Sequence, residues 1–244
     1  MRALFQAAMA CANLLVWGEA KMTQGVLFDF NGTLFLDTDK HEIAWREIYR
    51  KYRGRDISSD EYAAFIHGRA FPLVTEYVLG KDVSEEERYN VMIEKEILYR
   101  ELVRADPAGR QLVHGAADLL DELQARGIPF TIATASEITN VRFFFDIFSL
   151  SRWFAGPESI VYDDGTFPGK PAPDIYLRAA KLIGVAPADC LVVEDSPAGI
   201  KAAENAGVGK IVAMKSILDT AKVEGNPIIT AVIDNFEGFI ERFL

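Results

Sequence analysis

The chain has 244 residues, of which half are hydrophobic and a quarter are charged, and its formal net charge is −10 at pH 7. This length is enough for one large domain, or for a core domain with a smaller domain inserted into it. The acidic balance argues against nucleic acid as a partner, because binding to a phosphate backbone needs a basic surface. Small phosphorylated molecules are still compatible partners, since they need only a local positive pocket or a metal ion. Cys11 and Cys190 lie far apart in the sequence, so they predict no disulfide framework and are typical of a reducing cytoplasm.

The first 21 residues differ from the rest of the chain and form an extension of uncertain role. Arg2 and the apolar stretch Ala3–Cys11 loosely resemble a secretory or lipoprotein leader. Gln6 and Asn13 interrupt the apolar run, which is also too short for a membrane span. The alternative is that Met22 is the natural start and the preceding residues are an extended start; we favour this alternative. We therefore expect a cytoplasmic protein without a membrane partner.

The stretch from Gly25 to Leu34 contains the first candidate functional residue. It opens with an apolar run typical of a buried parallel strand, and the run breaks at Asn31-Gly32, a pair that tolerates a tight turn. Asp29 is therefore predicted at the carboxyl edge of a sheet, where open α/β proteins bind ligands. A carboxylate buried there alone is costly, so Asp29 needs a cation or a reacting group beside it.

Residues 37–111 are predicted to be helical, with no convincing strand. Apolar residues recur at helical spacing over 41–53, Ser58 and Glu61 form a possible capping box, and a long amphipathic helix starts at Ser84. An all-helical block that follows a single strand indicates an inserted cap domain. We therefore predict a core domain over residues 22–36 and 112–244, with the helical cap domain over 37–111.

Strands and helices alternate in the remainder of the chain. Strands are predicted at 130–134, 190–193, 210–213 and 228–233, with helices between them, among them one over 174–183 that ends at Gly184. This alternation predicts the α/β class with a doubly wound parallel sheet. The strand ends place polar residues on one edge of the sheet: Asp29, Asn31, Thr134, Ser136, Glu194 and Asp195.

Three of these edge residues are carboxylates that together suit a hard metal ion. Asp29, Glu194 and Asp195 offer oxygen ligands of the kind that Mg²⁺ prefers. The alternative for Glu194 and Asp195 is an ordinary helix N-terminus before Pro197, because acidic and hydroxyl residues are common there.

Lys170 and two hydroxyl residues are candidates for binding a phosphate. Lys170 precedes Pro171 and Pro173, and a constrained backbone lets it aim its ammonium group at the carboxylates or at a phosphate. Thr134 and Ser136 can donate hydrogen bonds to the same phosphate. The alternatives are a solvated surface lysine and ordinary turn residues.

In this order the motifs resemble those of the haloacid dehalogenase-like (HAD) hydrolase superfamily, in the branch with a helical cap. The first motif is Asp29–Leu34, and Thr134, Lys170 and the pair Glu194-Asp195 match the second to fourth. The segments 37–45, 170–174 and 194–200 are similar to the β-phosphoglucomutase-like phosphatases and mutases. The resemblance covers nearly the whole chain from about Gly25 and implies a Rossmann-like core.

The resemblance implies a Mg²⁺-dependent phosphatase that acts on a small phosphorylated metabolite. Asp29 is then the nucleophile that forms an aspartyl-phosphate, while Lys170 and Thr134 stabilise the transferring group. The metal ligands implied are Asp29, Glu194, Asp195 and the backbone carbonyl of Asn31. The substrate contacts implied are Gly32, Thr33, Ser136, His41 and Arg69. For His41, the alternative is a hydrogen-bonding residue at a helix start. For Arg69, the alternative is a surface residue, because Phe71, and not Arg69, is near the position of the family's substrate arginine.

The sequence departs from the family at Asn31, where phosphatases and mutases carry a second aspartate. That aspartate protonates the leaving oxygen and later activates water, whereas an amide exchanges no proton near neutral pH. We therefore expect a phosphatase-like enzyme that is weakened by Asn31. The alternatives, in order, are a phosphate-binding or regulatory protein with little turnover and a sugar phosphomutase. The sequence does not predict the oligomeric state.

Overall fold

The computed structural model describes residues 23–66, 71–80, 83–215 and 226–244. The predictions for residues 1–21, Cys11 and Arg69 lie outside these ranges. Within them, no helix is both long enough and apolar enough to cross a membrane.

The described residues form a six-stranded sheet in which every pair of neighbouring strands is parallel. The strands are β1 (Gly25–Phe28), β2 (Phe130–Glu137), β3 (Val161–Asp163), β4 (Cys190–Glu194), β5 (Lys210–Met214) and β6 (Ile229–Ile233), in the spatial order β3-β2-β1-β4-β5-β6. β1 lies between β2 and β4, and Phe28 pairs with Ile132 on one side and Val193 on the other. β1 and β4 therefore end within one residue of each other, and β2 runs on beside them, so the end of β2 lies at the same edge as the residues that follow β1 and β4.

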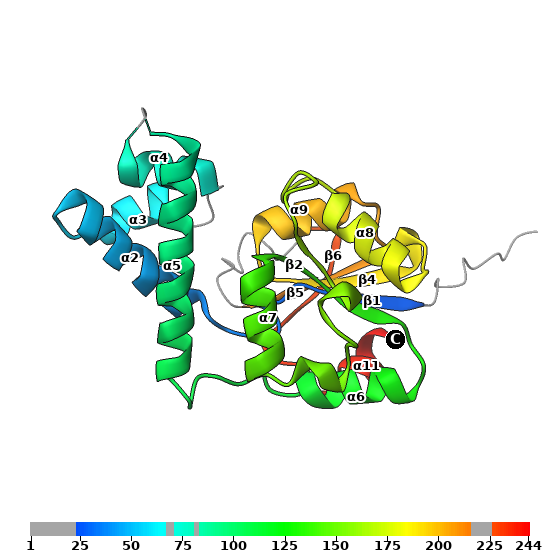
Figure 1. Cartoon of the computed structure of the whole chain (residues 1–244). Helices are drawn as coiled ribbons and strands as arrows, with labels where there is room; N and C mark the ends of the chain where they lie inside the picture. Colours follow the sequence, from blue (N-terminus) through cyan, green and yellow to red (C-terminus); the bar gives the residue numbers. More distant parts are fainter. Residues whose placement is uncertain (1–22, 67–70, 81–82, 216–225) are drawn as a thin grey trace, which may run out of the picture.

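Helices cover both faces of the sheet (Figure 1). The core helices are α6 (Ala116–Ala125), α7 (Ile138–Ile147), α8 (Asp174–Ile183), α9 (Pro197–Asn205) and α11 (Phe239–Phe243). α6, α7 and α11 pack with Phe28 and Val193 on one face, whereas α8 and α9 pack with Leu27 and Val192 on the other. Because strand residues alternate between two buried faces, β1 and β4 are apolar throughout. The α/β class with a doubly wound parallel sheet is confirmed.

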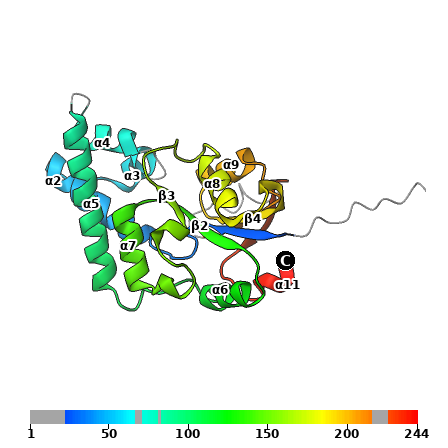
Figure 2. The same cartoon turned by 45° about the vertical axis from the view of Figure 1, so that its right-hand side comes forward.

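The helices between β1 and α6 form a separate unit to one side of the sheet (Figure 2). They are α2 (Thr38–Arg53), α3 (Ser59–Phe65), α4 (Phe71–Leu79) and α5 (Glu85–Ala105). They share an apolar cluster of their own, which includes Ile48, Tyr49 and Val78. The predicted capping box of Ser58 and Glu61 is present at the start of α3. The described part of 37–111 is thus helical, and its long helix α5 lies beside α7 of the core.

The structure differs from the sequence prediction in two strands. β3, which was not predicted, is an edge strand of three partly exposed or exposed residues, so it lacks the apolar run of the central strands. β2 runs on to Glu137, three residues beyond its predicted end, and carries Ser136 on the strand itself.

Candidate active site

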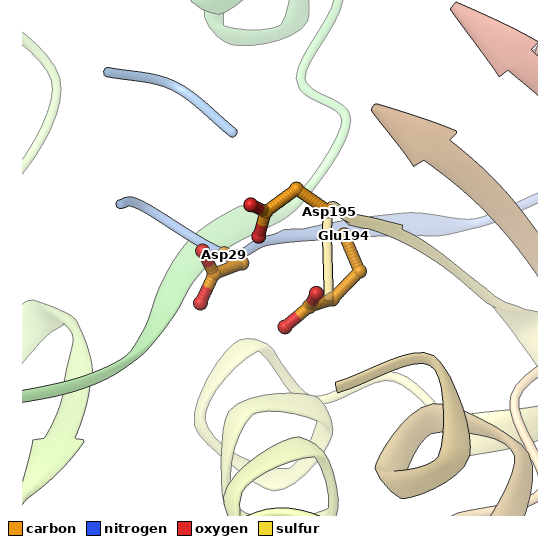
Figure 3. Close-up of side chains that lie close together, drawn as sticks. All are labelled: Asp29, Glu194 and Asp195. Carbon is orange, nitrogen blue, oxygen red and sulfur yellow. The ribbon is translucent and has the colours of Figure 1, made fainter. Parts of the chain in front are cut away.

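Three carboxylates meet at the edge formed by the ends of β1 and β4 (Figure 3). Asp29 follows β1, while Glu194 ends β4 and Asp195 follows it. One oxygen of each lies within 4.8 Å of the others, and all three side chains are buried, with Glu194 fully so. The backbone N–H of Asp29 donates to the Val193 carbonyl at 3.0 Å, which fixes the two strand ends side by side.

Two glycines make room for these carboxylates. A Cβ at Gly32, where φ is +79°, would lie 2.0 Å from Asp195 Oδ2. A Cβ at Gly199, in the first turn of α9, would lie 1.7 Å from Glu194 Oε1. Since both distances are far shorter than any real contact, a glycine is required at each position for the carboxylates to stay where they are.

Lys170 lies between two of the carboxylates. Its Nζ donates to Asp29 Oδ1 at 2.6 Å and to Glu194 Oε1 at 2.5 Å, and the side chain is 9% exposed. Tyr176 of α8 also donates to Glu194 Oε1, at 3.3 Å. The alternative interpretation of Lys170 as a solvated surface lysine is therefore wrong.

The charges of this cluster are not balanced. Burial raises the pKa of Asp29 well above its usual value, and Glu194 and Asp195 add to the rise while Lys170 opposes it. For Lys170, burial acts to lower the pKa, but the attraction of Asp29 and Glu194 outweighs it and the pKa is raised. When all four groups are ionised, the cluster carries two more negative than positive charges, which fits a divalent cation. Asp29, Glu194 and Asp195 supply hard oxygen donors for it.

Both oxygens of Glu194 accept hydrogen bonds from protein groups. Oε1 accepts from Lys170, and Oε2 accepts from the backbone N–H and the hydroxyl of Ser196 at 2.6 and 3.0 Å. Ser196 is also the N-cap of α9, where its hydroxyl accepts from the Gly199 N–H. This segment therefore caps α9 and at the same time supplies two carboxylates to the cluster, so the two interpretations are compatible.

The Asn31 side chain is fixed by hydrogen bonds at both ends of its amide. Its Oδ1 accepts from the Ser136 hydroxyl at 2.7 Å and from Thr134 at 3.4 Å. Its Nδ2 donates to Asp37 Oδ2 at 2.6 Å and to the Tyr99 hydroxyl at 3.4 Å. Hydroxyl donors on one side and a carboxylate acceptor on the other define which end of the amide is oxygen.

Asp37 is a buried carboxylate that connects the sheet edge to the helical unit. Its Oδ2 accepts from the Tyr99 hydroxyl and lies 3.4 Å from His41 Nε2, and the His41 and Tyr99 rings stack at 4.0 Å. Burial alone would raise the pKa of Asp37, but His41, Tyr99 and Asn31 outweigh it and the pKa is lowered. On the far side of His41, its Nδ1 lies 2.7 Å from Lys95 Nζ.

Sequence reasoning did not identify Asp37, Tyr99 or Lys95 as site residues. Tyr99 is 68 positions from Asn31, and no local pattern relates them. Lys95 is buried on α5, where periodicity predicts an apolar residue. Asp37 is the one of the three that the sequence could have indicated, because it follows the first motif closely and precedes His41.

These groups line a cavity of about 430 Å³ between the sheet edge and the helical unit. The predicted site residues in its wall are Asp29, Asn31, His41, Thr134, Ser136, Lys170, Glu194 and Asp195. Gly32 and Thr33 do not line it. The Gly32 N–H donates a hydrogen bond to the Phe35 carbonyl at 2.6 Å, and Thr33 is fully buried. Their predicted contact with substrate therefore has no support in this geometry.

The decisive comparison is with the family model of haloacid dehalogenase-like hydrolases, which matches residues 23–207. The chain belongs to this hydrolase family. The matched segment includes every residue of the carboxylate cluster and Lys170, so the predicted resemblance is confirmed.

Individual members of the HAD-like family agree with this assignment. The chain is 33% identical over 202 residues to hexitol phosphatase A of Escherichia coli (strain K12), covering 82% of this chain and 87% of that protein. It is 30% identical over 230 residues to a probable pseudouridine-5′-phosphatase of Drosophila melanogaster, covering 86% and 90%. A crystal structure of a family IA, variant 3 HAD hydrolase from Entamoeba histolytica superposes with a TM-score of 0.81 at 38% identity, covering 87% of this chain and 93% of that one.

Proposed function

We propose that this HAD-like hydrolase is a Mg²⁺-dependent phosphatase that acts on a small phosphorylated metabolite through an aspartyl-phosphate at Asp29. The observation that carries the proposal is the position of Asp29, which lies in a cavity wall with its carboxylate held by Lys170 and flanked by two further carboxylates. The related hexitol and pseudouridine-5′ phosphatases support a phosphate monoester as substrate. We also keep the prediction of a cytoplasmic location.

Asp29 carries the covalent chemistry in this proposal. One carboxylate oxygen attacks phosphorus, the bond from phosphorus to the ester oxygen breaks, and the alcohol leaves after taking up a proton. Water then attacks the same phosphorus, the bond from phosphorus to Asp29 breaks, and inorganic phosphate is released. The ionised carboxylate, which Lys170 favours by lowering the pKa of Asp29, needs no base for the first step.

The neighbouring side chains stabilise the negative charge of the transferring group. Lys170, which lies at Asp29, offers its ammonium group to the phosphoryl oxygens. The hydroxyls of Thr134 and Ser136, which donate to Asn31 Oδ1 in the free protein, donate to these oxygens instead. A Mg²⁺ ion held by Asp29, Asp195, Glu194 and the Asn31 backbone carbonyl would neutralise further charge on the phosphoryl oxygens.

Asn31 lowers the rate in this scheme because it carries no proton. General acid–base catalysis contributes roughly 10²–10⁴-fold, and without it the leaving oxygen takes its proton from water. The same observation supports a second candidate function, a phosphate-binding or regulatory protein with little turnover. A sugar phosphomutase comes third, since it must move protons to and from two hydroxyls.

The test is phosphate release with and without Mg²⁺ over a panel of sugar and nucleoside phosphates, for wild type and Asp29→Asn. We expect Mg²⁺-dependent release by the wild type and none by the variant. Glu204→Gln, which changes an exposed carboxylate on α9 that pairs with Lys201, is the matched control and should behave as wild type. If no compound is hydrolysed but one binds tightly with Mg²⁺, the phosphatase proposal fails and the binding function takes its place.

A further inference from the structure

The helical unit supplies an apolar part of the cavity wall. Trp45 of α2, Phe71 and Val74 of α4, Met92 of α5 and Ile66 after α3 line it. The Trp45 and Phe71 rings are 6.1 Å apart between centroids, inclined at 37°. Val74 and Ile66 are buried, whereas both rings are partly exposed, so the rings retain surface that a ligand in the cavity can cover.

The polar groups on the same wall already hydrogen-bond to one another. Lys95 Nζ lies 2.7 Å from His41 Nδ1 and donates to Glu96 Oε1 at 2.8 Å. Glu96 Oε2 in turn accepts from Asn140 of α7 at 2.7 Å, and His41 Nε2 faces Asp37. A ligand that needs these groups has to break bonds within the protein first.

This wall discriminates between classes of leaving alcohol. Each hydroxyl of an open-chain polyol loses water on entering and needs a new partner, and an unpaired hydroxyl weakens binding. The two faces of a flat ring need no such partner and gain by packing against aromatic side chains. The volume of about 430 Å³ lies in the range of small-molecule sites, so it has room for more than a phosphate group.

The charge of the cavity limits the substrate further. Glu96, Glu137 and Asp163 line it in addition to the carboxylate cluster. A second phosphate group on the substrate would face these carboxylates, and the Lys95 ammonium is already paired with Glu96. The cavity therefore favours a monophosphate over a bisphosphate.

We propose that the preferred substrate is a monophosphate ester whose alcohol carries a flat heteroaromatic ring, of the nucleoside 5′-monophosphate class. The phosphoryl group lies at Asp29 and Lys170, and the ring packs against Trp45 and Phe71. The assignment of the phosphoryl end rests on the proposed phosphatase function, while the assignment of the ring rests on the apolar wall.

The experiment compares uridine 5′-monophosphate with ribose 5-phosphate, which share the phosphorylated ribose and differ at its anomeric carbon, where the nucleotide carries the base and the sugar phosphate a hydroxyl. We expect kcat/KM to be roughly tenfold or more higher for the nucleotide, in the range that base stacking provides. Phe71→Ala and Trp45→Ala should each reduce this ratio severalfold. Leu73→Ala, on the same helix as Phe71 but exposed and outside this cavity, should leave the ratio as in wild type. Flavin mononucleotide and pyridoxal 5′-phosphate, assayed alongside, distinguish a nucleoside from other ring-bearing alcohols.

The outcomes separate the ring assignment from the phosphatase function. Turnover of ribose 5-phosphate or a hexitol phosphate as efficient as that of the nucleotide overturns the ring assignment and leaves the phosphatase proposal intact. If nothing is hydrolysed, calorimetric binding of the same two ligands to wild type with Mg²⁺ decides. Tighter binding of the nucleotide, lost in Phe71→Ala but kept in Leu73→Ala, supports the ring assignment, and equal or weaker binding overturns it.

Discussion

Asn31 lies where the family resemblance of the sequence implies an aspartate, and its surroundings match an amide. The Nδ2 group points at Asp37 Oδ2 from 2.6 Å, while Oδ1 receives the hydroxyls of Ser136 and Thr134. An aspartate in the same position would bring two carboxylates into contact, and like charges at that distance coexist only by sharing a proton. The carboxylate at 37 and the amide at 31 therefore form a complementary pair.

This pairing predicts the result of placing an aspartate at position 31. Asn31→Asp alone should raise phosphate release less than the exchange Asn31→Asp with Asp37→Asn, because only the exchange keeps a donor opposite the acceptor. We expect the exchanged variant to exceed wild type by roughly 10²-fold, the lower end of general acid–base catalysis. The measurement is the steady-state rate at saturating Mg²⁺ and substrate.

Asp37→Asn by itself is the matched control for that exchange. It should not exceed wild type, because it leaves two amides in contact and supplies no acid at position 31. A single Asn31→Asp variant as fast as the exchanged one would show that the two side chains do not constrain each other.

At the level of elements, the parts that could be predicted from sequence are those with a local signal. The apolar runs of β1 and β4 predict two buried strands whose polar ends share one edge of the sheet, and the helix over 174–183 is predicted to end before Gly184. The edge strand β3 has no such run, since it is short and half-exposed. The contacts of Tyr99 with Asn31 and Asp37 arise only when α5 packs against the core, so the periodicity of the sequence does not predict them.

The start of α9 gives an element-scale prediction. Gly199→Ala should improve helix propensity slightly, yet its Cβ would lie 1.7 Å from Glu194 Oε1, which Lys170 and Ser196 hold in place. We therefore expect a net loss of about 1–3 kcal/mol in the free energy of unfolding, as for overpacked cores, together with a loss of phosphate release. Chemical denaturation measures the first and the phosphate assay the second.

Gly169→Ala is the control for this substitution. Gly169 is next to Lys170 and has open space where a Cβ would be built, so its stability should stay near that of wild type. Equal stability of both variants would mean that Glu194 moves aside at little cost and that Gly199 is not required there.

For the whole molecule, the carboxylate cluster connects segments that are far apart in the chain. Asp29 follows the first strand, Lys170 precedes α8, Glu194 ends β4 and Asp195 follows it. A cation bound there would therefore stabilise the folded core as a unit. Burial, with Glu194 and Asp195, raises the pKa of Asp29 above its unfolded value. The native state then binds more protons than the unfolded state between those two pKa values. Without metal, this residue therefore makes the protein less stable as pH rises through that window.

Mg²⁺ should reverse this loss of stability with rising pH, because the ion takes the place of the proton on the carboxylates once they are ionised. We expect the increase in Tm on adding Mg²⁺ to grow from pH 5 to pH 8. At a free concentration 100 times its Kd, the ion contributes about 2.7 kcal/mol, a rise in Tm of roughly 5–10 °C for a chain of this size. In Asp195→Asn, the metal-free protein should depend less on pH and gain little from Mg²⁺, whereas Glu204→Gln should follow wild type. Thermal denaturation of the three proteins with and without Mg²⁺ measures these changes in Tm. If the Mg²⁺ effect is the same at every pH, or if it persists in Asp195→Asn, the ion binds somewhere other than this cluster.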